Sequence, residues 1–210
     1  MALANNIEVC RRSDGQVGLL ALAPVRRDTI LITYDGPLID HPTRYSIQID
    51  DQLHIEGTPE SNAFLNHSCA PNAYLDWNGV FLRALRDIQA GEELTCNYLT
   101  TDWELHEKFA CTCGAPNCYG EIRGFRYLSP EQQQALAPFV PEFMKKRISQ
   151  LAGGGVFMGF TNIGPDACQL CRDVWPSPRP GPDRGNLCLA GNHRGGVPGD
   201  LGAKGRGREL

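Results

Sequence analysis

The stretch FLNHSCAPN, residues 64–72, places an amide, an imidazole, a hydroxyl and a thiol next to one another in the chain. Three interpretations of its thiol, Cys69, are open. His67 could activate it as a nucleophile, it could be a small buried side chain, or it could bind a metal. The choice matters for the fold, because a metal ligand must meet further ligands from other parts of the sequence.

A second group of thiols lies in FACTCGAPNCYG, residues 109–120, where Cys111, Cys113 and Cys118 form a C-x-C-x4-C pattern. Three thiols this close on a turn rich in Gly, Pro and Asn suit a metal, and a structural zinc site needs four ligands. The alternative is three unrelated small buried thiols. Spacing alone does not choose the fourth ligand from the remaining cysteines, Cys10, Cys69, Cys96, Cys168, Cys171 and Cys188.

Composition limits the remaining classes of protein. The chain has 210 residues and a formal net charge of −4, so it can hold one ordinary domain with extra material, and a general nucleic-acid-binding surface is not favoured. No apolar run is long enough to cross a membrane, and the N-terminal residues lack the apolar segment of a secretion signal. We therefore expect an intracellular protein of the nucleus or cytoplasm, where nine cysteines indicate metal binding or chemistry rather than disulfides.

Residues 1–127 alternate short apolar runs, such as DTILITY and ELTCNYL, with turn signals such as DGP and QAGE. This pattern predicts a mainly β region of many short strands. Within it, DWNGV at residues 76–80 predicts a hairpin with a type I′ turn, because Asn and Gly tolerate the positive φ that this turn requires.

Residues 128–152 read as helix. Ser129 is a good N-cap, and Gln132 completes a capping box with it. Pro138 and Pro141 should divide the segment into two helices, because proline breaks a helix interior.

Residues 153–210 are rich in glycine and proline and lose apolar periodicity, so we expect a mostly disordered tail. The tail also offers a C-x2-C pair followed by a cysteine and a histidine. These residues form a possible second zinc site, and incidental thiols are the alternative: Cys168, Cys171, Cys188 and His193.

Three motifs in order carry a resemblance to a known family: NHSCAPN (66–72), GEELTCNY (91–98) and CTCGAPNCYGEIRGF (111–125). Together they resemble a SET-domain protein lysine methyltransferase with a post-SET zinc-binding segment, over about residues 8–127. The resemblance implies a mainly β, SET-type fold of short strands with a threaded C-terminal segment, a small zinc-bound post-SET loop and C-terminal helices. The implied division is a SET domain at 1–108, a post-SET segment at 109–127, a helical extension at 128–152 and the tail at 153–210.

The resemblance also implies an answer for Cys69. In the family the cysteine of the Asn-His-Ser-Cys motif is the fourth zinc ligand, so that the expected Zn²⁺ ligands are Cys69, Cys111, Cys113 and Cys118. The interpretation of Cys69 as a nucleophile then weakens, since His67 is only two residues away and the sequence offers no oriented third partner.

The activity implied by the resemblance is transfer of a methyl group from S-adenosylmethionine to the side-chain amine of a lysine in a protein, with histones among the candidates. The alternative is a catalytically weak or inactive SET-like zinc module that binds protein partners. We expect neither direct nucleic-acid binding nor a membrane partner, and we expect a monomer.

The resemblance assigns roles residue by residue. Tyr98, which ends ELTCNY, matches the catalytic tyrosine, and Tyr45 matches a second tyrosine of the lysine channel. The positions that match cofactor-binding residues are Gly15, Gln16, Val17, Gly18, Tyr34, Asn66, His67 and Tyr98. One departure concerns Cys96, because the family usually has an aromatic residue two positions before the catalytic tyrosine.

Overall fold

The computed structural model describes residues 2–11, 15–58 and 64–151. The predicted tail at 153–210, with its possible second zinc site, lies outside the described residues.

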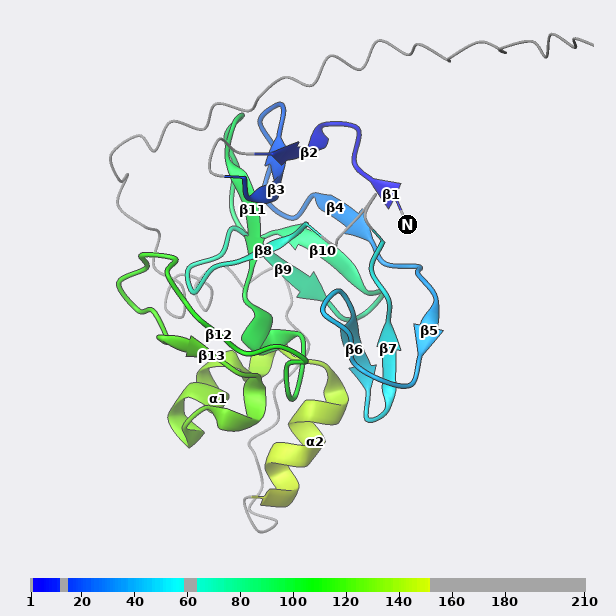
Figure 1. Ribbon diagram of the computed structural model, residues 1–210, viewed down its shortest axis with the longest axis vertical. Coiled ribbons are helices and arrows are strands. Elements are labelled where there is room, and N and C mark those ends of the chain that lie inside the picture. The colour runs from blue at the N-terminus through cyan, green and yellow to red at the C-terminus, as the bar shows by residue number, and fades with distance from the viewer. Residues whose placement is uncertain (1, 12–14, 59–63, 152–210) are drawn as a thin grey trace, which may run out of the picture.

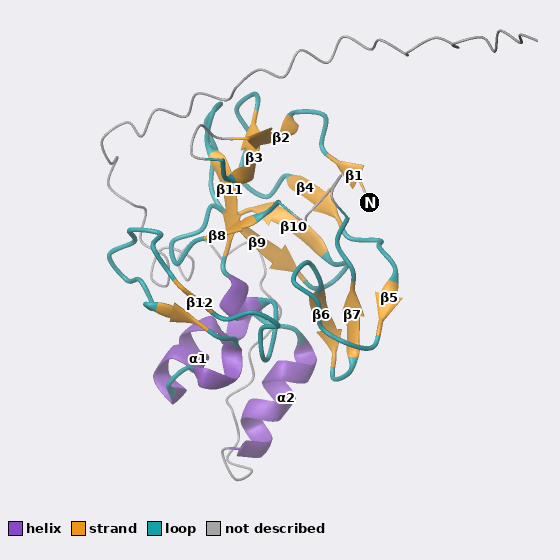
Figure 2. Cartoon of the chain, viewed as in Figure 1, coloured by secondary structure: helices purple, strands orange, loops and turns teal. Residues whose placement is uncertain are grey.

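The strands form three sheets and one short hairpin (Figures 1 and 2). The first sheet has the order β1 (Ala2–Leu3), β4 (Ile30–Thr33), β10 (Phe81–Ala84), β9 (Ala73–Asp76). The second has the order β2 (Ile7–Arg11), β3 (Val17–Ala21), β11 (Glu93–Cys96), β8 (Asn66–His67). The third contains β5 (Leu38–Ile39), β7 (Leu53–Ile55) and β6 (Ile47–Asp50), and β12 (Phe109–Ala110) pairs with β13 (Glu121–Ile122). The predicted mainly β region of short strands is thus confirmed, while the threaded segment stays a prediction.

The hairpin predicted from DWNGV is present between β9 and β10, but its turn is not of the predicted type. Asp76 pairs with Phe81, so that four residues form the loop. The residue with positive φ is Val80, at 52°. The Asp76 carboxylate accepts from both the backbone and the side-chain N–H groups of Asn78, at 3.1 Å each. These bonds hold Asn78 in a wider loop than the two-residue turn that the Asn-Gly pair suggested.

The pairing that positions the site is between β8 and β11, which run parallel with Thr95 opposite Asn66 and Cys96 opposite His67. β11 also pairs antiparallel with β3 on its other edge. This pairing places the ELTCNY motif beside the NHSC motif. Asn72 fixes this arrangement, because its side-chain amide donates to Glu93 O at 2.8 Å and accepts from Thr95 N–H at 2.9 Å.

The described residues contain two hydrophobic cores. The first lies among the sheets and includes the fully buried Leu19, Ile32 and Leu82. The second lies between the β12–β13 hairpin and the C-terminal helices, and it includes Phe125 and Phe139. Tyr98 packs against both.

The C-terminal helices follow the sequence prediction. The elements in this half of the structure are η1 (Tyr98–Thr100), η2 (Phe125–Tyr127), α1 (Pro130–Leu136), η3 (Ala137–Phe139) and α2 (Glu142–Leu151). Ser129 and Gln132 form the capping box at the start of α1. On α2, Arg147 bonds Asp51 at 2.7 Å, next to β6, and lies over the Trp103 ring. No helix among the described residues is both long and apolar enough to span a membrane.

Gly124 lies where its backbone passes close to the segment that follows Tyr98, and a side chain should not fit there. Its φ is +121°, and a Cβ there would lie 2.7 Å from the Trp103 carbonyl oxygen. We expect Gly124→Ala to lower the free energy of unfolding by about 2–4 kcal/mol, from backbone strain and the clash together. Urea unfolding measures the loss.

Gly91→Ala is the matched control, because Gly91 also has positive φ, at 83°, but has open space where its Cβ would lie. Its free energy of unfolding should fall by the backbone strain alone, roughly 1–2 kcal/mol. Equal losses in the two variants would contradict the close approach at Gly124.

Candidate functional site

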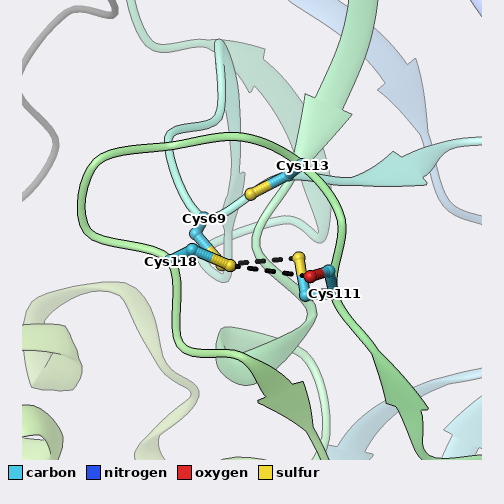
Figure 3. Close-up of side chains that lie close together, drawn as sticks. All are labelled: Cys69, Cys111, Cys113 and Cys118. Carbon is cyan, nitrogen blue, oxygen red and sulfur yellow. Dashed lines mark hydrogen bonds between the residues drawn. The ribbon is translucent and has the colours of Figure 1, made fainter.

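Four cysteine side chains converge at the junction of the second core and β8 (Figure 3). Cys69 follows β8, while Cys111, Cys113 and Cys118 come from the loop between β12 and β13. Their sulfur atoms all lie within 4.8 Å of one another. Among the cysteines that the structure describes, Cys69 is therefore the one that meets the C-x-C-x4-C loop.

The geometry of the four-cysteine cluster fits zinc. Tetrahedral thiolates about 2.3 Å from a shared metal lie roughly 3.8 Å apart, and the Cys69 sulfur lies 3.8 Å from that of Cys111 and 3.9 Å from that of Cys118. Backbone N–H groups also point at two sulfurs, from Tyr119 to Cys69 and from Gly120 to Cys118, at 3.4 Å each. Such donors stabilise thiolates, which are the form that binds metal.

Burial raises the pKa of the Cys69 thiol, and the neighbouring thiols Cys113 and Cys111 add to the rise. Burial likewise raises the pKa of Cys111, to about 11. For Cys113 the hydrogen bonds from backbone N–H groups and neighbouring thiols outweigh burial, and its pKa is lowered to about 7. A bound cation would offset the burial of negative charge that keeps Cys69 protonated.

Tyr98 begins η1 directly after β11 and lies beside His67. Its backbone N–H donates to His67 Nδ1 at 3.1 Å, and its hydroxyl donates to the Leu65 carbonyl oxygen. Burial raises the pKa of Tyr98, so the hydroxyl stays protonated. Since its proton is committed to Leu65, the hydroxyl oxygen keeps its lone pairs for another group.

Phe109 completes an aromatic group around Tyr98 that sequence reasoning missed. The Phe109 ring lies 6.1 Å from the Tyr98 ring and 5.7 Å from the His67 ring, with edge-to-face geometry in both cases. Phe109 is 37% exposed, so this aromatic wall reaches the surface. The sequence could have indicated this contact. Phe109 lies two residues before Cys111 and His67 lies two residues before Cys69, so a cluster that brings the two cysteines together also brings Phe109 towards His67.

The side chain of Asn66, in β8, reaches residues 17–18 of β3, the strand on the other edge of β11. Asn66 Nδ2 donates to the Val17 carbonyl at 2.8 Å and to Glu93 Oε1 at 2.6 Å. A Cβ on Gly18 would lie 2.4 Å from Glu93 Oε1, so a larger residue there would displace the Glu93 carboxylate from its bond to Asn66. Because both amide protons of Asn66 are used, its oxygen is left as an acceptor. Glu93 was not named as a site residue from the sequence, and only its place in the GEELTCNY motif could have indicated such a role.

Comparison with known proteins gives the family. A model of the SET domain family matches residues 16–99. The chain contains a SET domain.

Relatives of this SET domain are methyltransferases by name. They include histone-lysine N-methyltransferase ATXR7 of Arabidopsis thaliana, 33% identical over 49% of this chain and 9% of that protein. Methyltransferase flvH of Aspergillus flavus is 37% identical over 39% of this chain and 47% of its own length. The histone-lysine N-methyltransferase, H3 lysine-36 specific, of Homo sapiens is 30% identical over 80% of this chain and 7% of that protein. The chain thus spans less than half the length of each of these relatives.

Among solved structures, the crystal structure of KRYPTONITE in complex with mCHG DNA and SAH is similar. Its TM-score is 0.47 and its sequence identity 26%, over 58% of this chain and 30% of that chain.

The remaining predicted residues of the SET domain lie in other segments than Tyr98. Tyr45 is 44% exposed before β6, and the ring contacts described for Tyr98 are to His67 and Phe109 rather than to Tyr45. Tyr34 is buried in the first core. Gly15 precedes β3 with a φ of +85°, and Gln16 follows it, so both are close in sequence to Val17. The roles assigned to these residues stay predictions.

A buried carboxyl group lies four residues after Tyr98. Asp102 is 4% exposed, and burial raises its pKa to about 7, although hydrogen bonds from Thr101 and the Gln48 backbone oppose the rise. Its Oδ1 lies 3.9 Å from His54 Nδ1, a buried atom without a hydrogen-bond partner among the described residues. Asp102 is thus a site where ionisation costs stability.

The free energy of unfolding should therefore depend on pH through Asp102. The folded-state pKa is about 7, above the ordinary aspartate pKa of 3.8, so the folded protein holds the proton more tightly. The stability that this proton supplies is full below about pH 4 and falls as the pH rises to about 7, by up to about 1.4 kcal/mol per pH unit. Asp102→Asn should remove this fall, since an amide does not ionise. Urea unfolding between pH 4 and pH 8 measures it.

Asp50→Asn is the control, because Asp50 is an exposed carboxylate at the end of β6. Its unfolding curve should keep the pH dependence of the natural chain. If Asp102→Asn also keeps it, then Asp102 does not titrate as its burial requires.

Proposed function

We propose that this chain transfers a methyl group from S-adenosylmethionine to the side-chain amine of a lysine in a protein substrate. The observation that carries the proposal is Tyr98, whose backbone is held by His67 and whose hydroxyl proton is committed to Leu65. The SET domain and its methyltransferase relatives support it. Histones are the first candidate substrates, because several relatives are named for histone lysines, and the nucleus is then the proposed location.

The residues around Asn66 fit the methyl donor. Asn66 presents an acceptor oxygen, and Glu93 adds a negative charge beside it, which together suit the ammonium group of a methionine-type ligand. Gly18 has no side chain, which lets the Glu93 carboxylate and the Asn66 amide lie close to the backbone of β3. S-adenosylmethionine, when bound, supplies a methyl group on a sulfonium, which is a good leaving group. We assign its binding to Gly15, Gln16, Val17, Gly18, Tyr34, Asn66, His67 and Tyr98.

Tyr98 would act by position rather than by taking a proton. Its raised pKa makes it a poor source of tyrosinate, and its lone pairs can orient a lysine amine beside the methyl group. The amine must be neutral to attack, and the rings of Tyr98, Phe109 and His67 form an apolar wall that disfavours the charged ammonium. We keep Tyr45 as a proposed second residue of the channel, acting from the exposed loop before β6.

Tyr98→Phe should test the catalytic role, because it keeps the ring and removes the hydroxyl. Losing a positioning hydrogen bond should cost about 2–4 kcal/mol of transition-state stabilisation, or roughly 30- to 1000-fold in kcat. Transfer of labelled methyl groups to histones and to a cell lysate measures it. Tyr127→Phe is the control, because the exposed Tyr127 bonds Glu104 instead. Turnover by Tyr98→Phe at the natural rate would refute the mechanism, and no turnover by the natural chain would favour a non-catalytic binding module.

We further propose that Cys69, Cys111, Cys113 and Cys118 hold one structural Zn²⁺ per chain, within a SET domain at 1–108 and a post-SET segment at 109–127. The helical extension would then be residues 128–152, with the tail at 153–210. The zinc would join a loop that has little core of its own to β8, since metal–thiolate bonds replace missing hydrophobic contacts.

Elemental analysis of the purified protein should find one zinc per chain. Cys113→Ser should lose it, because a hydroxyl is a far weaker zinc ligand than a thiolate, and unfolding should begin at lower temperature. Cys96→Ser is the control, since Cys96 is buried in the first core and not in the four-cysteine cluster. It should keep its zinc. A natural chain without zinc would refute the assignment.

A further inference from the structure

The imidazole of His67 bridges the four-cysteine cluster and the turn that carries Tyr98. On one side Nδ1 accepts the Tyr98 backbone N–H at 3.1 Å. On the other side Nε2 lies 3.3 Å from the Cys69 sulfur. One side chain therefore contacts both a proposed zinc ligand and the proposed catalytic residue.

The direction of the two hydrogen bonds follows from the donors. A backbone N–H can only donate, so Nδ1 of His67 must present its lone pair to Tyr98. The single proton of the ring is then on Nε2, and it points at the Cys69 sulfur. That sulfur also receives the Tyr119 N–H at 3.4 Å. Two donors on one sulfur suit a metal-bound thiolate, whose charge makes it a good acceptor.

We propose that His67 is a positioning residue that couples metal occupancy of the four-cysteine cluster to the placement of Tyr98. The inference rests on the proposed function for the meaning of Tyr98, but the coupling itself is a statement about structure. A bound metal fixes the Cys69 sulfur relative to the three sulfurs of the β12–β13 loop. Because His67 bonds both the Cys69 sulfur and the Tyr98 N–H, it holds the Tyr98 backbone relative to the metal. Without metal the sulfur loses this constraint, and the Tyr98 backbone is held less firmly.

Ring packing gives the coupling a second contact. The His67 ring lies 5.3 Å from the Tyr98 ring and 5.7 Å from the Phe109 ring. Phe109 is in β12, which leads directly into Cys111. Phe109 therefore joins the start of the metal-binding loop to the rings of both His67 and Tyr98.

Two substitutions separate the two hydrogen bonds. In His67→Asn the shorter amide reaches the position of Nδ1 and can still accept from Tyr98, but it cannot reach Cys69. Zinc affinity, measured by competition with a chromogenic chelator, should fall about 10- to 100-fold, which is the usual effect of losing a bond to a metal ligand. In His67→Gln the amide reaches the position of Nε2, so zinc affinity should be nearly natural while the Tyr98 anchor is lost. Its kcat should fall by a larger factor than its KM changes.

Hydrogen exchange at the Tyr98 amide tests the coupling without any assay of activity. In the natural chain this amide should be protected when zinc is bound, and protection should fall at least tenfold after zinc is removed by a chelator. In His67→Gln it should be unprotected in both states. His106→Asn, at an exposed histidine, is the control and should behave as the natural chain.

The outcomes separate the two proposals. If exchange at Tyr98 responds to zinc but no methyl transfer is found, the coupling stands and the proposed activity fails. If methyl transfer is found but exchange at Tyr98 ignores zinc, or if His67→Asn binds zinc like the natural chain, the coupling is wrong.

Discussion

The parallel pairing of β8 with β11 is the constraint on which the rest of the site depends. It brings residues 66–69 beside residues 95–98, and a further bond from Ser68 N–H to the Cys96 carbonyl, at 3.0 Å, extends it. β8 has only two residues, and so short a pair would not hold by itself. Asn72 adds two hydrogen bonds to the backbone of β11, at Glu93 and Thr95, as a neighbouring strand would. The whole motif from Asn66 to Asn72 thereby acts as one edge of the sheet.

The two cores explain why the C-terminal helices belong to the site. Cys69 is fully buried in the second core, together with residues of η3 and α2 such as Phe139 and Met144. The indole N–H of Trp77, in the β9–β10 loop, donates to the Phe139 carbonyl at 2.7 Å and joins the helices to the first sheet. Cys69 is thus enclosed between a sheet and a helical layer, whereas the cysteine loop that meets it is half-buried at Cys111 and Cys113 and exposed at Cys118.

The sequence predicted the features that depend on local rules and on motif spacing. The capping box at Ser129 was predictable because both of its hydrogen bonds are local, and the order of the motifs implied that Cys69 would meet the cysteine loop. Features set by contacts between distant segments were missed. Phe109 reads as an ordinary strand residue, and Asp102 reads as a solvated acid until the fold buries it. The cysteine spacing left six candidates for the fourth zinc ligand, because spacing carries no information about which distant thiol the fold brings close.

The polar groups around Tyr98 favour positioning over proton transfer. Burial lowers the pKa of His67 to about 4, so that its imidazole is neutral, and burial raises the pKa of Tyr98. The His67 ring has both nitrogens in use, and the Tyr98 hydroxyl donates to Leu65. Neither group is a ready base at neutral pH, because each would have to give up a hydrogen bond and accept a charge in a buried place. A substrate amine would therefore have to lose its proton through desolvation on entry, with the proton passing to solvent. Such a site would gain its rate from fixed distances, and this fits the way in which backbone groups hold the side chains of His67 and Tyr98.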